Sequence, residues 1–501
     1  MEKQLKCVLL LSLKEMALRK VMVILWSDSD ILAFISKLQF DMLTPDEIET
    51  EWRETAEDKV KDKVAKLELP ESLKKQMIDV VYPIGLEIGR WKESHEDYFL
   101  DSWDQIIAPD LAKLCWTAAG TIDCRKTAEK LIHCDVLYVV QSYRLACDYC
   151  LEDYIPLLWE EVPEWMKDQF CNYKGLSPHL KFCWPYILKG EQSKLDYLLR
   201  TSDRNLTTFN QYAFEYSAEN GNKTATEYFF HKLTDEEREN SLMRTTHAVV
   251  AAIQNISPSE YFEDSPKDSP KFSSVLCYLL SVMTPVQQME IFESRPVDIL
   301  FSFLDWPWQD LFSENAGLIW TFLPPSNYGD LLWRMADRYT KADFYLPKLF
   351  QEVFVQSPLG FKKSFVDKEP EFNYISACDF LSLLFDFDDS ETIGVIFRNV
   401  DGADRVKLVC HPHVLEQFYY CMLEDRWHMV EVCLREAMLS KQNRERLKET
   451  FMGFLKSNIT GEIEWENQNL KRFFEFLDEA DASADKQKKA QKRKLENCCA
   501  E

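Results

Sequence analysis

Two cysteines three residues apart, Cys147 and Cys150, form the fragment of this sequence most typical of metal or redox chemistry. Cys171, His179 and Cys183 follow in the same region, and thiolate and imidazole are the usual ligands of zinc. A zinc site normally needs a second close pair of ligands, and the spacing from Cys171 to Cys183 is too open for the usual knuckle. Because Cys147 and Cys150 fall one helical turn apart beside apolar residues, the pattern favours packing in the core. A metal-dependent enzyme with a site near Cys147 and His179 is the alternative.

A second group with ligand chemistry, Cys410, His411 and His413, surrounds Pro412, where a turn with exposed histidines needs no metal. Glycine-rich phosphate-binding motifs are absent from the sequence, and so are H-E-x-x-H and G-x-S-x-G. The 84 acidic residues are expected to lie mainly on solvated helix faces, so no two of them stand out as an acid and a base. We therefore predict no catalytic residue, no cofactor and no metal.

Composition bounds the partners and the compartment. The formal net charge of -25 disfavours nonspecific binding to nucleic acid or to anionic membranes, because the mean field of the protein repels both. The 15 cysteines are scattered through apolar helical patterns, which is typical of reduced core thiols. The apolar run over residues 7–13 is too short for a signal peptide or a bilayer span. We expect a cytoplasmic protein, with a nuclear location as the alternative, and neither nucleic acid nor a membrane among its partners.

The elements that would position any of these residues are predicted to be helices. Residues 205–239 contain a complete helix, turn and helix: an apolar stripe with helical spacing runs from Phe209, and Asn220-Gly221 supplies a turn able to adopt positive φ. Thr234 and Glu237 then have the spacing of a capping box at the start of a further helix. This unit predicts two antiparallel helices joined by a tight turn.

Similar turns recur along the chain, predicted near Asp153, Gly190, Gly221, Asp389 and Asp425. The first three are 37 and 31 residues apart, a spacing within the range of helix-pair repeats. We therefore predict an all-α protein, an elongated array of degenerate helix-pair repeats of the ankyrin-like or α-solenoid type. Such an array presents a long surface suited to binding another protein.

The predicted organisation has five parts: an N-terminal helical region over 1–100, repeats over 101–256, a Pro/Ser-rich linker over 257–271, further repeats over 272–477 and a disordered basic tail over 478–501. The lysine-rich residues 486–494 are typical of a nuclear-import signal and equally of a solvated end. Cys498-Cys499 beside that basic run leaves a lipid anchor as a third interpretation.

Leu13, Ala17 and Val21 lie four residues apart, on one stripe of a helix predicted near the N-terminus. They resemble the elongin-binding helix of SOCS-box proteins, the substrate receptors of cullin-RING ubiquitin ligases, where a leucine, a small residue and an aliphatic residue have this spacing. Ala17 replaces the cysteine that is usual in that family and preserves its small volume. An ordinary amphipathic helix packed on the repeats is the alternative interpretation of the stripe.

A second segment, containing Leu67, Leu69, Pro70 and Leu73, is similar to the Leu-Pro-rich cullin-binding element of SOCS boxes. It lacks the first proline of that element and lies farther from the helix than in the family. The remaining chain is similar in style to degenerate ankyrin-like proteins, although the full T-P-L-H signature is missing. The resemblance implies binding to elongin B/C and to a cullin, with the repeats recognising a target protein.

The function expected from the sequence is therefore that of a non-enzymatic protein-interaction protein, a substrate receptor of an elongin/cullin-RING ubiquitin ligase. A structural scaffold without ubiquitin chemistry is one alternative, and the metal-dependent enzyme near Cys147 and His179 is the other. The sequence does not specify the target of the repeats, the repeat curvature or the oligomeric state.

Overall fold

The computed structural model describes residues 5–37, 51–99, 110–134, 136–172, 179–200, 208–255, 269–329, 331–332, 335, 347–367, 376–458 and 467–478. The regular elements over these residues are helices, and the extended backbone among them is limited to an isolated bridge between Trp116 and Ile122. The prediction of an all-α protein is confirmed. The chain divides into two compact units, unit 1 (Met1–Asn315) and unit 2 (Ala316–Glu501).

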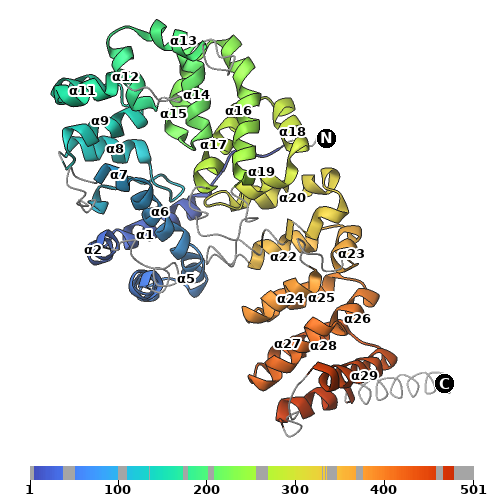
Figure 1. Ribbon diagram of the computed structural model, residues 1–501. Helices are drawn as coiled ribbons and strands as arrows, with labels where there is room; N and C mark the ends of the chain where they lie inside the picture. The colour runs from blue at the N-terminus through green and yellow to red at the C-terminus, as the bar shows by residue number, and fades with distance from the viewer. Residues whose placement is uncertain are drawn as a thin grey trace, which may run out of the picture. The chain divides into compact units, whose positions relative to one another are not determined.

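The described helices of unit 1 follow one another in the colours of the first part of the chain (Figure 1). In order they are α1 (Leu13–Trp26), α2 (Ser29–Lys37), the π-helix η2 (Trp52–Glu57), α4 (Asp58–Ala65), α5 (Glu71–Ile78), α6 (Val81–Ser94), α7 (Glu96–Phe99), the 3-10 helix η3 (Leu111–Lys113), α8 (Cys124–His133), α9 (Val139–Asp148), α10 (Ile155–Glu161), α11 (Glu164–Cys171), α12 (Leu180–Leu188), α13 (Gln192–Arg200), α14 (Phe209–Glu219), α15 (Lys223–Lys232), α16 (Asp235–Asn255), α17 (Ser269–Val282), α18 (Pro285–Ser294) and α19 (Pro296–Ser302).

Helix α20 (Gln309–Phe322) contains the boundary between the units. The described helices that follow it are the 3-10 helix η5 (Pro325–Asn327), α22 (Pro347–Gln356), α23 (Leu359–Asp367), α24 (Ala377–Asp386), α25 (Ser390–Asn399), α26 (Gly402–Val409), α27 (Pro412–Leu423), α28 (Trp427–Ala437), α29 (Lys441–Asn458) and a last helix over residues 468–478. Within unit 2, α24 packs against α27 while α25 packs against α28, so one helix pair lies directly on the next (Figure 1).

One type of reversal joins the helices of several pairs. A residue with positive φ follows the helix end, and the amide of the next residue donates to the carbonyl five residues before it. In the α14–α15 pair the residue is Gly221, at φ 70°, and Asn222 N lies 2.9 Å from Ser217 O. This is the hydrogen bond of a Schellman motif, which satisfies a carbonyl that the helix end would leave without a donor. The residues at positive φ in these reversals are Cys150, Gly190, Gly221, Asp388 and Asp425.

Three of the predicted turns, at Gly190, Gly221 and Asp425, fall on the residue that holds the positive φ. The turn predicted at Asp389 is centred one residue earlier, because Asp389 is the N-cap of α25 and its carboxylate accepts from Thr392 N at 2.9 Å. The turn predicted near Asp153 was placed too late. Helix α9 ends at Asp148, and the reversal is completed by Cys150.

The predicted linker over residues 257–271 falls within unit 1. Residues 256–268 lie outside the described residues, and α17 begins at Ser269, so the last three residues of the predicted linker are helical. The predicted tail beyond residue 478 also lies outside the described residues. The capping box predicted for Thr234 and Glu237 is present, with Glu237 N 3.3 Å from the Thr234 hydroxyl and Thr234 N 2.8 Å from the Glu237 carboxylate.

The N-terminal part of unit 1 packs around Trp26, the last residue of α1. Its side chain is fully buried, stacks on Trp52 at 5.8 Å between ring centroids, and donates its indole N–H to Val81 O at 2.9 Å. Gly85 of α6 lies against the ring, and a β-carbon at this position would lie 2.2 Å from Trp26 Cζ2. Because no side-chain atom fits at that distance, the packing of α1 on α6 depends on a glycine.

We expect Gly85→Ala to lower the free energy of unfolding of unit 1 by about 1–3 kcal/mol, because overpacking outweighs the roughly 1 kcal/mol that alanine gains in a helix. Urea unfolding followed by circular dichroism measures the change. Gly453→Ala in α29 is the matched control, since a β-carbon there meets nothing within 4 Å and only the helix-propensity gain should remain. An alanine at 85 that leaves stability unchanged would show that α1 and α6 are not in such close contact.

Candidate functional site

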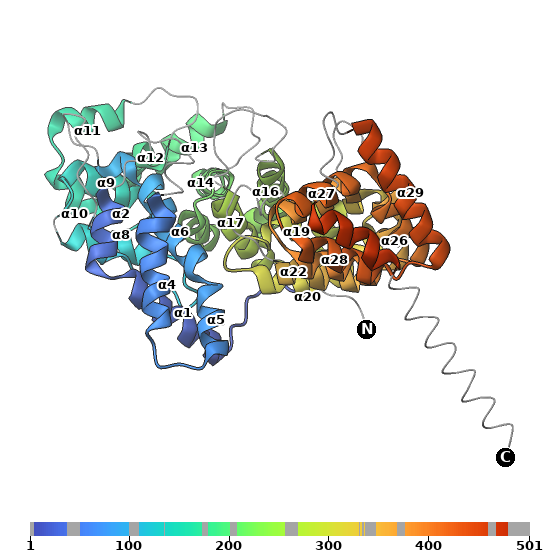
Figure 2. The same ribbon diagram turned by 90° about the horizontal axis from the view of Figure 1, so that it is seen from below.

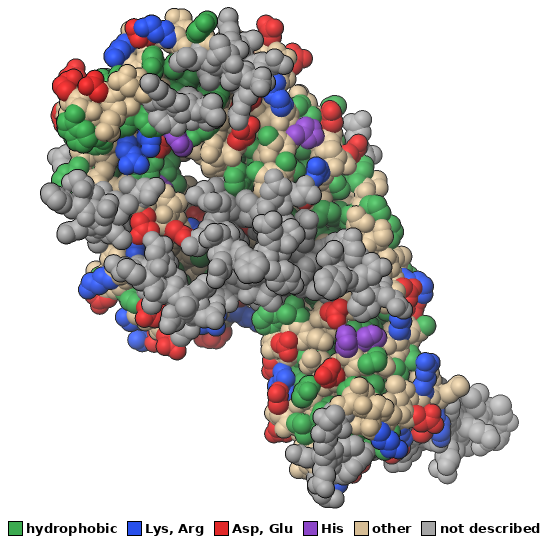
Figure 3. Space-filling view, in the orientation of Figure 1, with side chains coloured by type: hydrophobic (Ala, Val, Ile, Leu, Met, Phe, Trp, Pro, Cys, Tyr) green, Lys and Arg blue, Asp and Glu red, His purple; other side chains and the backbone are tan. Residues whose placement is uncertain are grey.

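Unit 1 contains an open cavity of about 890 Å³, and the space-filling view shows an opening in this part of the surface (Figure 3). Its wall is drawn from α6, α7, the start of α8, the end of α9, the start of α12, and the facing sides of α14 and α15. The volume lies within the range of about 300–1,000 Å³ that is typical of ligand pockets. Polar and aromatic side chains dominate the wall, so a ligand there would be held by hydrogen bonds and aromatic faces.

Four tyrosine hydroxyls on the wall each bond an ionisable side chain from a different element. The partners are 37 to 76 residues apart in sequence, so the pairs tie α6, α7, α12, α14 and α15 to one another and to the end of α9. The bonds made by Tyr98 and Tyr149 are half-buried, whereas those made by Tyr216 and Tyr228 are exposed. The pairs are Tyr98–Asp148, Tyr149–His95, Tyr216–His179 and Tyr228–Glu152.

Asp148 is the carboxylate partner of Tyr98 in these pairs. Burial raises the pKa of its carboxyl, and the hydrogen bond from Tyr98 opposes that effect. The pKa of the Tyr98 hydroxyl is raised well above its usual value, first by burial and then by the charge of Asp148. The backbone carbonyl of Asp148 accepts from the Asn222 side chain at 2.7 Å. Hydrogen bonds from α7 and from the α14–α15 turn therefore fix the position of the end of α9.

His179 bonds the Tyr216 hydroxyl through Nδ1 at 2.6 Å. Burial lowers the pKa of its imidazole, and the charge of Lys181 lowers it further. Both effects favour the neutral ring, which carries one acceptor nitrogen. His179 is thus committed to a hydrogen bond in the cavity wall.

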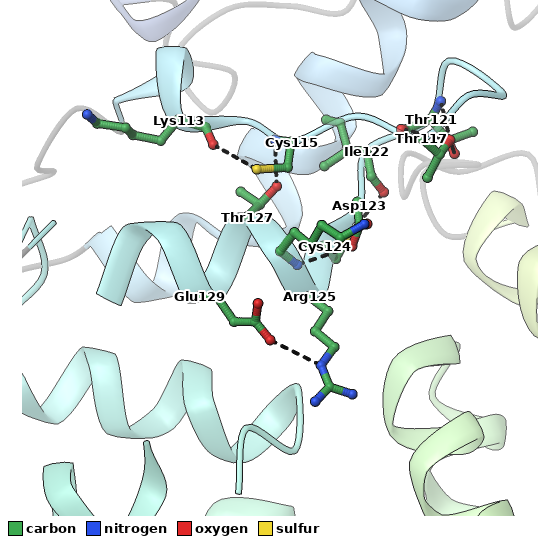
Figure 4. A network of polar contacts seen from close by, with 11 residues as sticks. Lys113, Cys115, Thr117, Thr121, Ile122, Asp123, Cys124, Arg125, Thr127 and Glu129 are labelled. Carbon is green, nitrogen blue, oxygen red and sulfur yellow. Dashed lines mark hydrogen bonds and ion pairs between the residues drawn. The ribbon is translucent and has the colours of Figure 1, made fainter. Parts of the chain in front are cut away.

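The segment before α8 forms another part of the wall, and Figure 4 shows its polar contacts. Thr117 N donates to Thr121 O at 2.9 Å across a turn that contains Gly120 at φ 74°. The Asp123 carboxylate caps α8 by accepting from Lys126 N at 3.1 Å. These contacts orient the first turn of α8, from which Arg125 extends and bonds Glu129 at 3.2 Å (Figure 4).

The thiols that the sequence singled out lie in the core. Cys147, Cys150 and Cys183 are buried, and burial raises the pKa of all three, to about 12 for Cys183. Nucleophilic or metal-binding thiols have the opposite shift, because the thiolate is the reactive form. The alternative enzyme site pairs His179 with Cys147, but the His179 imidazole bonds the Tyr216 hydroxyl. Core packing, the preferred interpretation of Cys147 and Cys150, agrees with their burial.

The second predicted ligand group is also engaged in local structure. His411 is the N-cap of α27, where its Nδ1 accepts from His413 N at 3.4 Å, and the His413 ring lies 3.3 Å from an Asp379 carboxylate oxygen. Cys410 is half-buried, and burial raises the pKa of its thiol. Over the described ranges of the chain, no three His, Cys, Asp or Glu side chains are grouped so that they could hold a metal ion.

The predicted elongin-binding residues lie on α1, which begins at Leu13 because Ser12 and Glu15 form a capping box. Leu13 is 83% exposed, Ala17 is exposed and Val21 is half-buried. The opposite face of the helix is the one that enters the core, through Met22, Val23 and Trp26. Ile24 is 59% exposed and continues the outer stripe by one turn. The stripe predicted from the sequence has three residues and omits Ile24.

Of the predicted cullin-binding residues, Leu67, Leu69 and Pro70 lie in the turn between α4 and α5, and Leu73 lies in the first turn of α5. Leu69 and Pro70 are exposed, whereas Leu67 and Leu73 are half-buried. Helix α1 packs against both α4 and α5, which lie beside it in Figure 2. The structure therefore brings the two segments into the same part of unit 1, although 46 residues separate Val21 from Leu67 in the sequence.

Neither a comparison with models of known protein families nor a search of curated proteins finds a match for this chain. Among the helices that the structure describes, none combines the length and the apolar character needed to cross a membrane. Function is therefore inferred from the exposed face of α1, the turn after α4 and the cavity of unit 1.

We expect Asp148→Asn to gain stability relative to the parent protein as the pH rises from 4 to 7. The folded state of the parent binds the Asp148 proton more tightly than the unfolded chain does, because the folded pKa is raised above the ordinary value of 3.8. The parent therefore loses this contribution to stability as the pH rises through the raised pKa. Asparagine keeps an oxygen that accepts from Tyr98 but carries no charge.

Urea unfolding of the parent and of the variant at pH 4 and pH 7 measures this difference. Asp153→Asn, at an exposed position in the same turn, is the matched control and should show no such pH-dependent gain. If the stability difference between Asp148→Asn and the parent were the same at both pH values, Asp148 would not be held in a site that favours its protonated form.

Proposed function

We propose that the protein is a non-enzymatic protein-interaction protein that recruits elongin B/C through α1, and through it a cullin, as the substrate receptor of a ubiquitin ligase. The outward apolar face of α1 is the observation that carries this proposal. Leu13 and Ile24 are 83% and 59% exposed, and Ala17 lies between them on the same face. An amphipathic helix that offers such a stripe fits a hydrophobic groove on a partner.

The buried face of α1 supports the same proposal. Its residues alone hold the helix on the core of unit 1, so the outward stripe is not needed for that packing. Arg19, only 7% exposed, donates to Ala119 O at 2.9 Å and stacks 4.2 Å from the centre of the Trp306 ring. With Met22, Val23 and Trp26, it fixes α1 on the core of unit 1. Leu13 and Ala17 are therefore not needed for ordinary packing, the alternative role that an amphipathic helix suggests.

The turn between α4 and α5 would supply the cullin contact. Leu69 and Pro70 are exposed at its tip, and Lys74 Nζ donates to Ala65 O at 3.0 Å across it. Pro70 also begins α5, since its carbonyl accepts from Lys74 N at 3.1 Å. A turn closed in this way presents its apolar residues in a fixed conformation.

The helix pairs would recognise the target. We propose that they form a degenerate ankyrin-like or α-solenoid array, because the same reversal with a positive-φ residue recurs in both units. Such arrays bind partners over an extended surface. The described cysteines are free thiols, which favours the cytoplasm or the nucleus as the compartment.

The test of recruitment is capture of purified elongin B/C by the parent protein and by a Leu13→Asp, Ala17→Asp double variant. Loss of an apolar anchor from the centre of an interface typically costs about 2 kcal/mol or more, so binding should weaken by at least about 30-fold. The free energy of unfolding should change by less than about 0.5 kcal/mol, because both positions are exposed.

The matched control is a Leu157→Asp, Leu359→Asp double variant, which adds the same charge at leucines that are 63% and 71% exposed on α10 and α23. Elongin capture should be unaffected by this control. Failure of the parent to capture elongin B/C would reject recruitment and leave the scaffold without ubiquitin chemistry as the better account of the helix pairs.

A further inference from the structure

The cavity of unit 1 contains hydrogen-bond donors that no described residue uses. Helix α15 begins at its edge with Lys223 and Thr224, and both residues line the cavity. The Asn222 cap satisfies the amide of Ala225 at 3.1 Å, whereas the amides of Lys223 and Thr224 donate to no acceptor among the described residues. The first turn of a helix carries partial positive charge and binds anions.

A buried hydroxyl lies beside this helix start and points to the same kind of ligand. Ser217 is 1% exposed, its Oγ has no hydrogen-bond partner, and the residue lines the cavity. It is close to α15 in the fold, because its carbonyl accepts from Asn222 N at 2.9 Å. Buried polar groups without a partner are rare in folded proteins, so this hydroxyl is available to a ligand in the cavity.

The charged groups on the cavity wall differ in whether they already have a partner. Its five carboxylates all have a donor already: Glu87 accepts from Ile122 N, Asp123 from Lys126, Asp148 from Tyr98, Glu152 from Tyr228 and Lys232, and Glu227 from Lys223. Among the cations, Arg125 bonds Glu129. Arg90 makes no hydrogen bond or ion pair with any described residue. Its charge lowers the pKa of the Glu87 carboxyl, although burial raises that pKa overall. The Arg90 guanidinium, the amides of Lys223 and Thr224 and the Ser217 hydroxyl are therefore donors on the wall that an anion can use.

We propose that this cavity binds an anionic side chain, a carboxylate or a phosphoryl group, on a peptide segment of the target protein. The start of α15, Ser217 and Arg90 bind the anionic oxygens. The half-buried Trp308, which also lines the cavity, contacts the flanking residues. That the ligand is a peptide rests on the proposed function as a receptor of protein targets.

Three pools of fluorescein-labelled nonapeptides, identical in their randomised flanks and carrying phosphoserine, glutamate or serine at the centre, test the proposal on the full chain. Fluorescence anisotropy at physiological ionic strength should show at least one anionic pool binding about tenfold or more tighter than the serine pool. The stronger of the two anionic pools identifies the source of the charge. Equal binding of all three pools, or binding of none, would overturn the proposal.

Variants assign the binding to this cavity. Arg90→Met should weaken the anionic pool by about tenfold or more, because a charged hydrogen bond is lost. Lys59→Met is the matched control, since it removes the same charge from an exposed position on α4. A loss of equal size in both variants would show that net charge alone is responsible.

A pair of variants isolates the backbone amide at the start of α15. Lys223→Pro and Lys223→Ala remove the same side chain, but only proline also removes the N–H, and proline is well tolerated at the first position of a helix. The proline variant should bind the anionic pool about threefold to tenfold more weakly than the alanine variant. Equal affinities, with equal melting temperatures, would exclude the helix start from the site.

The proposed function and this inference fail separately. Elongin B/C capture is measured on the same Arg90 and Lys223 variants and depends on α1, which does not line the cavity. Retained elongin capture without binding of any anionic pool would reject the cavity site alone. Selective binding of an anionic pool by a parent protein that captures no elongin would support the cavity site and reject recruitment.

Discussion

The helix pairs depend on single residues that hold a positive φ. Glycine adopts this conformation without strain, as at Gly221, but the reversals at Cys150, Asp388 and Asp425 place an L side chain in the left-handed region. The reversal at Cys150 fixes where α9 stops and therefore where Asp148 and its neighbours emerge. The one at Gly221 brings the last turn of α14 and the first turn of α15 to the same edge of the cavity. The geometry of these turns therefore determines where the side chains of the cavity wall are placed.

Helix ends also link successive pairs, because the carbonyls left without a donor there are used by side chains from elsewhere in the unit. In unit 1, the Trp184 indole donates to Cys147 O at 3.1 Å and the Asn222 amide donates to Asp148 O at 2.7 Å. In unit 2, the Arg426 guanidinium donates to Phe385 O at 2.7 Å. Asn222 and Arg426 occupy the same place in their motifs, directly after the residue with positive φ. The two units therefore use one device to hold one helix pair against another.

Local features of this fold could be predicted from the sequence, whereas the cavity could not. Asn220-Gly221 and the Thr234 capping box report on a few neighbouring residues, and both were predicted correctly. Cysteine is not a residue that signals a left-handed turn, which is why the reversal at Cys150 was placed late. The tyrosine pairs of the cavity join residues 37 to 76 positions apart, so only the tertiary structure brings them together.

The sequence predicts the apolar stripe on α1 but not whether that stripe is exposed or buried. Leu13, Ala17 and Val21 define a stripe that any helical periodicity would reveal, but periodicity does not say which of two apolar faces the core takes. Trp26 decides the matter, because its fully buried ring orients the helix and turns Leu13 outward. Extending the stripe by one further turn would have identified Ile24 as its last exposed member.

Because Trp26 and Arg19 hold α1 in place from within, the helix is a preorganised surface, and a partner that binds it spends no free energy on ordering a flexible segment. The same attachment makes binding and folding thermodynamically linked. A partner that recognises only the folded helix raises the melting temperature of unit 1 in proportion to the logarithm of its concentration. Conversely, a substitution deep in the core beneath Trp26 would lower affinity at a surface that it never touches.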